Sequence, residues 1–449
     1  MKLRFAGIAA ALSLSLSACG GGGGTPAGPA PSTNPSASPV PSGKITHVVI
    51  IFQENRSPDN LFQGLTGADI ATSGKNSRGQ TVPLTPVPLD SVFDVDHSHS
   101  PSFLNEYNNG QMNGFDKVTF SCAPGGCGNV TPTAYGYVPP SQVQPYFAMA
   151  KRYTFADRMF QSNSGPSFPA HQYIISGTAE TAPGSTLYAA ENPRYANNNV
   201  GNCDGDPSST VGLIDINTGQ ETQESKPCFD HPTLFDEMDA AGVSYKYYTA
   251  PAAGLWNAPD AISHIRFGSD WSHVIVGNTA ILTDIANSQL PAVSWVIPNS
   301  AQSDHAKIND GSGPDWVATV VNAVGQSPYW QNTAIFVTWD DWGGWYDHVA
   351  PKQYDKFELG FRVPLIVVSP YAKPAYVSHV QHEFGSILHF TEETFGLPSL
   401  GYTDARADDL RDCFDFSQTP LTFSTIQTRH KASYFMKLPP SNVPIDDDF

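Results

Sequence analysis

The chain has 449 residues and a formal net charge of −18, which argues against sequence-independent nucleic-acid binding because that activity needs a basic surface. Only 15% of the residues are charged, and the 38 glycines and 38 prolines indicate a loop-rich globular enzyme rather than a helical bundle. The length allows one large α/β domain with insertions, or two domains.

The N-terminus has the layout of an export signal. Lys2 and Arg4 form a positive region, and the mostly apolar stretch from Phe5 to Leu16 is too short to span a bilayer as a helix. The sequence Leu-Ser-Ala-Cys that ends at Cys19 resembles the bacterial lipobox, in which the cysteine is lipid-modified and becomes the first residue; the alternative is a plain secretory signal that contains a cysteine. We therefore expect residues 1–19 to be a lipoprotein signal peptide and the protein to be exported and lipid-anchored at Cys19 in the bacterial cell envelope, in the periplasm or at the outer membrane.

The remaining chain divides by composition. Residues 20–43 are mostly Gly, Pro, Ser, Thr and Ala, a composition that forms no core and predicts a flexible tether. We expect residues 44–449 to form one catalytic domain, with a surface insertion near residues 181–227, where the sequence is polar and rich in glycine and asparagine.

An exported protein meets an oxidising compartment, so disulfides are expected. Cys122 and Cys127 could close a small loop, Cys203 and Cys228 could close the insertion, and Cys413 would then stay free. No spacing of cysteine and histidine predicts a structural zinc site.

Hydrophobic patterns predict strands that alternate with helices. Strands are expected at residues 45–52, 243–248, 292–298, 335–339 and 361–369. Helices are expected at residues 139–150, with Ser141 as a possible N-cap, and at 168–178, 233–241, 279–286, 316–324 and 382–395. This alternation predicts a three-layer α/β sandwich, with helices on both faces of a largely parallel sheet.

Polar side chains follow three of these buried strands. Glu54 and Asn55 come after the first strand, His305 after the strand at 292–298, and Asp340 and Asp341 after the strand at 335–339. In open α/β sheets ligands bind outside the carboxyl ends of the strands, and adjacent carboxylates in such a place are costly unless a cation neutralises them. These donors suit one divalent metal ion; the alternative is a solvated turn with helix-capping residues.

A nucleophile and proton donors are also present. Ser167 follows Gly-Pro, a stiff turn, and a hydroxyl beside a divalent cation loses its proton more readily. His97, His264 and His305 could bind phosphoryl oxygens or protonate a leaving alkoxide. Each residue alone has a simpler explanation as a turn residue or a solvent-facing histidine. The hypothesis of a shared site therefore rests on the occurrence of all of these residues together.

Ordered motifs then resemble a known family. Nine segments resemble, in order, motifs of the bacterial and fungal phosphoesterase family. They are ITHVVIIFQENRSPDNLF (45–62), DVDHSHS, NNGQMNGF, the Gly-Pro-Ser167 turn, TLFDEMDAAGVSYKYY, SDH, TWDDWGGWYDHV, RVPLIVVSPYA and ADDLRDCFDF. This family contains acid phosphatases and phospholipases C, and it belongs to the alkaline-phosphatase-like superfamily. The resemblance covers residue 45 to about residue 422.

The resemblance implies an alkaline-phosphatase-like fold and a site whose members have distinct roles. The positions that hold the single active-site metal ion, of unknown identity, are matched by Glu54, Asn55, Asp340 and Asp341. The nucleophile is matched by Ser167, and the histidines of the phosphate pocket by His97, His305 and His264. For Asp347 and His348 we favour a structural role.

The expected reaction is phosphoester hydrolysis through a phosphoserine, with an acidic pH optimum because histidines act as charged donors. Serine at position 167 and the short chain after the last motif favour an acid phosphatase acting on phosphomonoesters. The alternative is a phospholipase C that cleaves phosphatidylcholine-type diesters, and a non-enzymatic alternative is a surface binding protein on the same fold.

Overall fold

The computed structural model describes residues 40–197, 199–250 and 254–439. The predicted signal peptide, Cys19 and most of the tether lie outside these described residues. Within the described part of the chain, no helix has both the length and the apolar character needed to cross a membrane.

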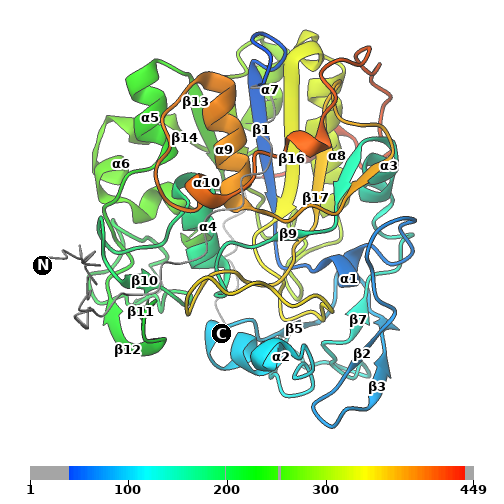
Figure 1. Ribbon diagram of the computed structural model, residues 1–449, viewed down its shortest axis with the longest axis vertical. Helices are drawn as coiled ribbons and strands as arrows, with labels where there is room; N and C mark the ends of the chain where they lie inside the picture. The colour runs from blue at the N-terminus through cyan, green and yellow to red at the C-terminus, as the bar shows by residue number, and fades with distance from the viewer. Residues whose placement is uncertain (1–39, 198, 251–253, 440–449) are drawn as a thin grey trace, which may run out of the picture. The chain divides into compact units, whose positions relative to one another are not determined.

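An eight-stranded sheet forms the centre of the fold (Figure 1). In spatial order its strands are β14 (Val274–Val276), β13 (Tyr245–Thr249), β15 (Val293–Val296), β1 (His47–Gln53), β16 (Thr333–Trp339), β17 (Leu365–Val368), β8 (Thr154–Ala156) and β18 (Tyr376–Ser378). All neighbouring strands pair parallel except β17, which is antiparallel to both β16 and β8.

Helices cover both faces of the sheet. In one layer α4 (Ser167–Ser176) contacts both α5 (Leu234–Ala241) and α9 (Phe384–Phe395), and in the other α8 (Gly313–Gly325) contacts both α3 (Gln144–Arg152) and α7 (Ala280–Ala286). Figure 1 shows α4 and α9 in front of the sheet and α7 and α8 behind it. The predicted three-layer α/β sandwich with a largely parallel sheet is confirmed.

Two predicted helices begin later than expected. The helix predicted from residue 139 begins at Gln144, and its N-cap is Val143 rather than Ser141, because Pro139 and Pro140 lead into turns before it. The helix predicted from residue 382 begins at Phe384, because His382 and Glu383 form strand β19 beside β9 (Met159–Phe160).

The core explains why the central strands are apolar throughout. Every residue of β16 is buried, and six of the seven residues of β1 are buried, since helices cover both of their faces. A second, mostly aromatic cluster lies apart from this core and contains Phe103, Phe115, Trp342, Trp345 and Phe361. It packs against the loop after β16 and so fixes that loop in place.

The predicted insertion forms a small sheet of its own. Strands β10 (Leu187–Ala189), β11 (Val211–Asp215) and β12 (Gln220–Ser225) pair antiparallel. The disulfides Cys122–Cys127 and Cys203–Cys228 both form, and Cys413 is free and buried, as the sequence predicts.

Candidate active site

The two pairs of acidic and amide residues meet at one edge of the sheet. Strands β1 and β16 pair in parallel with Gln53 opposite Trp339, so the residues that follow each strand lie side by side. The Asp340 backbone N–H donates to the Gln53 carbonyl (3.0 Å), and the Asn55 N–H donates to Asp340 Oδ1 (2.9 Å). The expected proximity of the two strand ends is confirmed.

Ser167 reaches the same point from helix α4. It is the first residue of α4, directly after Pro166 at the N-cap, and only 1% of its surface is exposed. Its Oγ donates a hydrogen bond to Asp341 Oδ2 (3.0 Å). A serine hydroxyl therefore lies at a helix N-terminus, where the helix dipole favours negative charge.

Negative charge is concentrated here, and the nearby His97 supplies some positive charge, since, although burial lowers the pKa of its ring, the charge of Asp341 raises it. Glu54, Asp340 and Asp341 are fully buried. Burial and the charge of Asp340 raise the pKa of both Glu54 and Asp341 well above their ordinary values. Buried carboxylates of this kind need a counter-charge, so the chemistry of the donors fits a bound cation.

Buried oxygen atoms without a hydrogen-bond partner among the described residues also indicate a bound cation. Glu54 Oε1, Asn55 Oδ1 and Asp340 Oδ2 accept no hydrogen bond from the described part of the chain, although all three are buried. Buried polar atoms without a partner are rare in proteins. The donor atoms of Glu54, Asp340 and His171 also lie within 4.8 Å of one another, close enough to share one metal ion.

Two of the three predicted histidines lie beside this cluster. His97 donates from Nδ1 to the Val95 carbonyl (2.8 Å), and its Nε2 lies 2.9 Å from the side-chain amide nitrogen of Asn55. His305 donates from Nδ1 to the Ala306 carbonyl (2.7 Å), and its ring centroid lies 5.8 Å from that of His97. Both rings are held by backbone carbonyls, which fixes the direction of each Nε2.

The structure does not bring the third predicted histidine to the cluster. His264 lies on α6 (Ser263–Phe267), with Nδ1 2.5 Å from Asp230 and Nε2 3.3 Å from Asp236. The hydrogen bond that His264 donates to Asp236 outweighs partial burial and raises the pKa of His264 to about 9. No contact among the described residues joins it to Ser167, so His264 forms an ion pair near the start of α5.

Sequence reasoning missed His171. It lies on α4 four residues after Ser167, so both side chains are on one face of the helix. Its Nε2 is 3.3 Å from Glu54 Oε1 and 3.7 Å from Asp340 Oδ2, and burial lowers its pKa to about 4 despite the charge of Asp340. Its spacing of four residues from the predicted nucleophile Ser167, within a predicted helix, is the sequence feature that could have identified it.

Asp347 and His348 lie in a separate network of charges. Asp347 accepts two hydrogen bonds from Arg362 Nε, both of 3.0 Å, and His348 Nδ1 lies 2.7 Å from Asp59 Oδ2. Arg362 and Asp59 are fully buried, so this network joins three of the sequence motifs. Such contacts suit the structural role expected for Asp347 and His348.

A cavity of about 630 Å³ has Asp96 and Asn192 in its wall, and none of its lining residues belongs to the carboxylate cluster. Asn192 accepts a hydrogen bond from the N–H of Phe168, the residue after Ser167 (3.0 Å), so the cavity lies near the start of α4. Its acidic lining residues are Asp96, Glu191, Glu221 and Glu224, and Arg194 is the basic one. The cavity is therefore suited to a neutral or cationic group more than to an anion.

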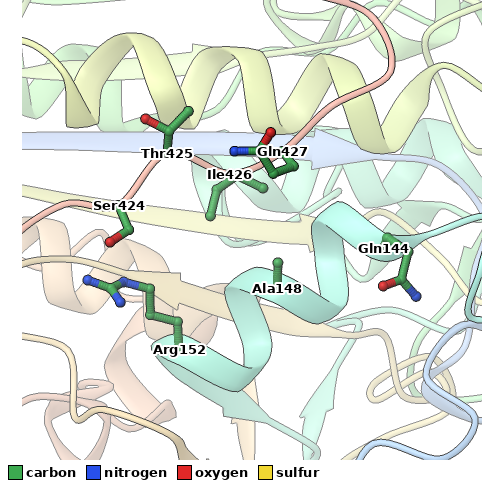
Figure 2. Close-up of a pocket in the computed structure, with 7 residues that line it drawn as sticks. All are labelled: Gln144, Ala148, Arg152, Ser424, Thr425, Ile426 and Gln427. Carbon is green, nitrogen blue, oxygen red and sulfur yellow. The ribbon is translucent and has the colours of Figure 1, made fainter.

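A second cavity, of about 260 Å³, lies between α3 and residues 424–427 (Figure 2). It is lined by Gln144, Ala148 and Arg152 from α3 and by the four residues of that segment. None of its lining residues belongs to the carboxylate cluster.

Buried carboxylates, a serine and histidines gathered at the strand ends of an α/β sheet are the parts of a hydrolytic centre. The chain belongs to the Phosphoesterase family, whose model matches residues 45–398. It is a phosphoric ester hydrolase.

Curated relatives match most of the chain. Phospholipase C B of Mycobacterium tuberculosis is 26% identical over 88% of this chain and 82% of its own length. The hemolytic phospholipase C of Pseudomonas aeruginosa is 24% identical over 83% of this chain and 56% of its own length. Non-specific phospholipase C6 of Arabidopsis thaliana is 24% identical over 84% of this chain and 74% of its own length.

Among solved structures, a protein in the alkaline phosphatase superfamily from Vibrio parahaemolyticus is similar to this chain. It has a TM-score of 0.40 and 10% identity, and the match covers 82% of this chain and 70% of that one.

Proposed function

We propose that this protein is an acid phosphatase that hydrolyses phosphomonoesters through a phosphoserine formed on Ser167. The observation that carries the proposal is the position of Ser167 Oγ, 3.0 Å from Asp341 Oδ2 at the N-terminus of a buried helix. His97 lies beside Asn55, and its ring centroid is 5.8 Å from that of His305, so two imidazoles would be available to meet the double negative charge of a monoester.

Glu54, Asn55, Asp340 and Asp341 would hold one divalent cation. When bound, the cation supplies positive charge that lowers the pKa of a nearby hydroxyl and offsets charge on the phosphoryl oxygens. Oxygen donors suit calcium, magnesium or manganese, and imidazole nitrogen also suits zinc or iron.

The protein's own residues then account for the steps of hydrolysis. Asp341 orients Ser167 Oγ and takes its proton on Oδ2 as Oγ bonds to phosphorus and the bond from phosphorus to the alcohol oxygen breaks. A histidine gives the departing oxygen a proton, and the helix N-terminus meets the phosphoryl charge. Water then attacks the phosphoserine and gives one proton to that histidine, and Asp341 returns its proton to Ser167 Oγ as phosphate is released.

A second candidate is the phospholipase C reaction on diesters with a cationic alcohol. The acidic cavity near the start of α4 favours this candidate, since its carboxylates would attract a cationic head group. The phospholipase C names of the relatives support it as well.

One assay series tests both candidates. The purified domain from residue 44 is assayed on p-nitrophenyl phosphate and p-nitrophenyl phosphorylcholine from pH 4 to pH 9, with and without a chelator. We expect faster turnover of the monoester, loss of activity with the chelator, and a decline above neutrality because a histidine donor loses its proton there. Preference for the choline ester would favour the second candidate, and inactivity on both substrates contradicts both.

Ser167→Ala tests the nucleophile. We expect its kcat to fall by at least about 10⁴-fold, since removal of a catalytic nucleophile leaves only binding and electrostatic effects. Ser164→Ala is a matched control, because Ser164 lies in the same turn and its Oγ donates only to the Phe357 carbonyl among the described residues. Activity retained by Ser167→Ala, with an unchanged thermal melt, would refute the assignment.

We also propose that the mature protein is exported and attached to a membrane of the cell envelope through a lipid on Cys19. The resemblance of residues 16–19 to a lipobox supports this proposal. Cys19→Ser is expected to move the protein from the membrane fraction to the soluble fraction.

A further inference from the structure

His171 is the buried side chain at the strand ends to which the steps above give no task. Helix α4 places it one turn after Ser167, and none of its surface is exposed. Its ring packs near those of Phe52 and Trp256, with centroid distances of 6.1 and 6.4 Å. These aromatic neighbours restrict the direction in which Nε2 points.

Hydrogen bonding accounts poorly for this position. His171 Nε2 lies 3.3 Å from Glu54 Oε1 and 3.5 Å from Glu54 Oε2. A hydrogen bond between an imidazole and a carboxylate is normally about 2.7–2.9 Å long. The ring thus faces the carboxylate from a distance at which it gains little from direct contact.

The separations suit donors arranged around a common cation. Donor atoms that bind one metal ion at about 2.1 Å lie roughly 3.0–3.4 Å apart in octahedral or tetrahedral geometry. His171 Nε2 lies 3.3 Å from Glu54 Oε1 and 3.7 Å from Asp340 Oδ2, close to that range. These two oxygen atoms accept no hydrogen bond from the described residues, so both have lone pairs available.

We propose that His171 Nε2 is a further ligand of the divalent cation, alongside Glu54 and Asp340. This inference rests on the metal site of the proposed function. A nitrogen donor among oxygen donors shifts the preference of the site from calcium and magnesium toward zinc or iron. His171 would therefore take part in selecting the metal.

Pulsed EPR of the protein loaded with Mn²⁺ alone tests the ligand directly. The wild-type protein should show coupling of the Mn²⁺ electron spin to a directly bound histidine nitrogen, with the ¹⁵N pattern when histidine is ¹⁵N-labelled. His171→Gln should lose this coupling, because glutamine can still donate to Glu54 but offers no imidazole nitrogen. His305→Gln is the matched control and should retain it. Absence of the coupling in the wild-type protein, or its loss only in His305→Gln, overturns the proposal.

A double variant that keeps His171 provides a second test if His171→Gln does not fold. In the double variant His97→Gln/His305→Gln, His171 is the remaining histidine at the cluster, and the coupling should persist. Its loss there overturns the assignment to His171.

Calorimetric titration with Zn²⁺ and with Ca²⁺ supplies a second measurement. His171→Gln should weaken Zn²⁺ binding by about 10-fold or more and change Ca²⁺ binding less than about 2-fold, since a hard cation gains little from imidazole. Equal losses for the two ions contradict a nitrogen ligand. Failure of the wild-type protein to bind any cation would refute the proposed metal site as well, whereas binding without histidine nitrogen refutes only this inference.

Discussion

Asn55 and Gly343 form a close backbone contact beside the carboxylates. Asn55 has the left-handed φ of 62°, and Gly343 has a φ of 63°. A Cβ atom on Gly343 would lie 2.4 Å from the Asn55 carbonyl oxygen, a distance that side chains do not tolerate. The loop after β16 can therefore fold over the loop after β1 only because this residue has no side chain.

Gly343→Ala should displace Asn55 and lower kcat/KM at least about 10-fold, since errors of about 1 Å in a catalytic centre can cost 100-fold. Gly64→Ala is the matched control: Gly64 has a φ of 80° but open space around its Cβ position. This control should lose about 1–2 kcal/mol of stability from backbone strain and keep its kcat/KM. Steady-state kinetics and thermal melts of both variants check the prediction, and a normal kcat/KM for Gly343→Ala would contradict it.

The sequence predicts the location of a side chain best where the residue directly follows a recognisable strand. Glu54 and Asp340 follow apolar strands directly, so the end of each strand fixes where they lie. His171 was missed because its direction depends on where helix α4 begins, and that start follows the Gly-Pro turn rather than a hydrophobic pattern. The pair of Asp347 and Arg362 was missed because two loops meet only in the folded chain.

Strands are predictable when they are long and central. β1 and β16 have seven residues each and were expected, whereas β8, β14 and β18 have three residues each and lack a readable pattern. The antiparallel direction of β17 could not be predicted either, because a buried strand has the same composition in both directions.

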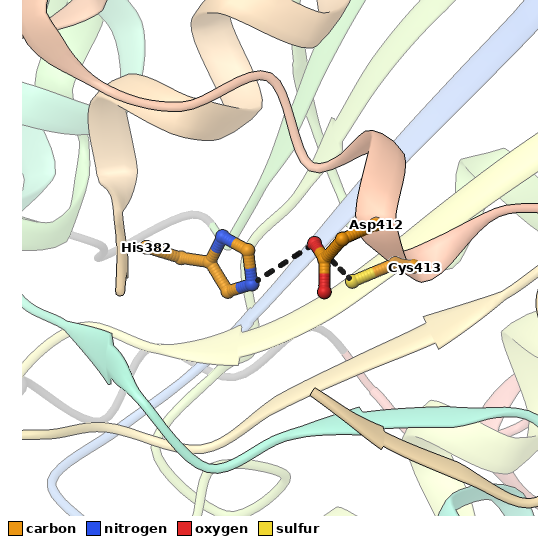
Figure 3. A group of neighbouring side chains, drawn as sticks. All are labelled: His382, Asp412 and Cys413. Carbon is orange, nitrogen blue, oxygen red and sulfur yellow. Dashed lines mark hydrogen bonds and ion pairs between the residues drawn. The ribbon is translucent and has the colours of Figure 1, made fainter. Parts of the chain in front are cut away.

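His382 connects strand β19 to the late motif ADDLRDCFDF. Its Nδ1 lies 2.6 Å from Asp408 and its Nε2 lies 3.5 Å from Asp412, as Figure 3 shows for the second contact. Its Nε2 also lies 3.2 Å from Ser378 Oγ at the end of β18. The buried ring thus holds helix η7 (Arg411–Cys413) against the edge of the central sheet.

This contact predicts a dependence of stability on pH. Burial lowers the pKa of His382, but the charge of Asp408 and its hydrogen bond outweigh burial, so the pKa rises above 6.5. The folded state therefore binds this proton more tightly than the unfolded state. The stabilisation is fully present below about pH 6.5 and is lost as the pH rises through the raised value.

Urea unfolding from pH 5 to pH 9 measures the effect. The free energy of unfolding of the wild-type protein should fall above about pH 6.5 more steeply than that of His382→Gln, which lacks the titrating group. The difference between the two curves isolates His382 from the other ionisable groups. Parallel curves over this range would contradict the prediction.

At the scale of the whole molecule, the negative net charge opposes attachment to an anionic membrane surface. The net charge of the chain is −18. Anionic lipid surfaces repel such a chain, and the repulsion is screened by salt. Attachment to a membrane would therefore depend on apolar insertion, which the proposed lipid on Cys19 supplies.

Salt concentration and substitution of Cys19 distinguish a lipid anchor from electrostatic adsorption to the membrane. The wild-type protein should stay in the membrane fraction at about 1 M salt, where the Debye length is roughly 3 Å, and should be released by detergent. Cys19→Ser should be soluble at every salt concentration. Cys413→Ser, a change at a buried cysteine of the folded domain, should remain with the membrane. Because repulsion weakens as salt rises, salt should tighten rather than loosen a lipid-anchored association, so release of the wild-type protein by salt alone would refute the anchor.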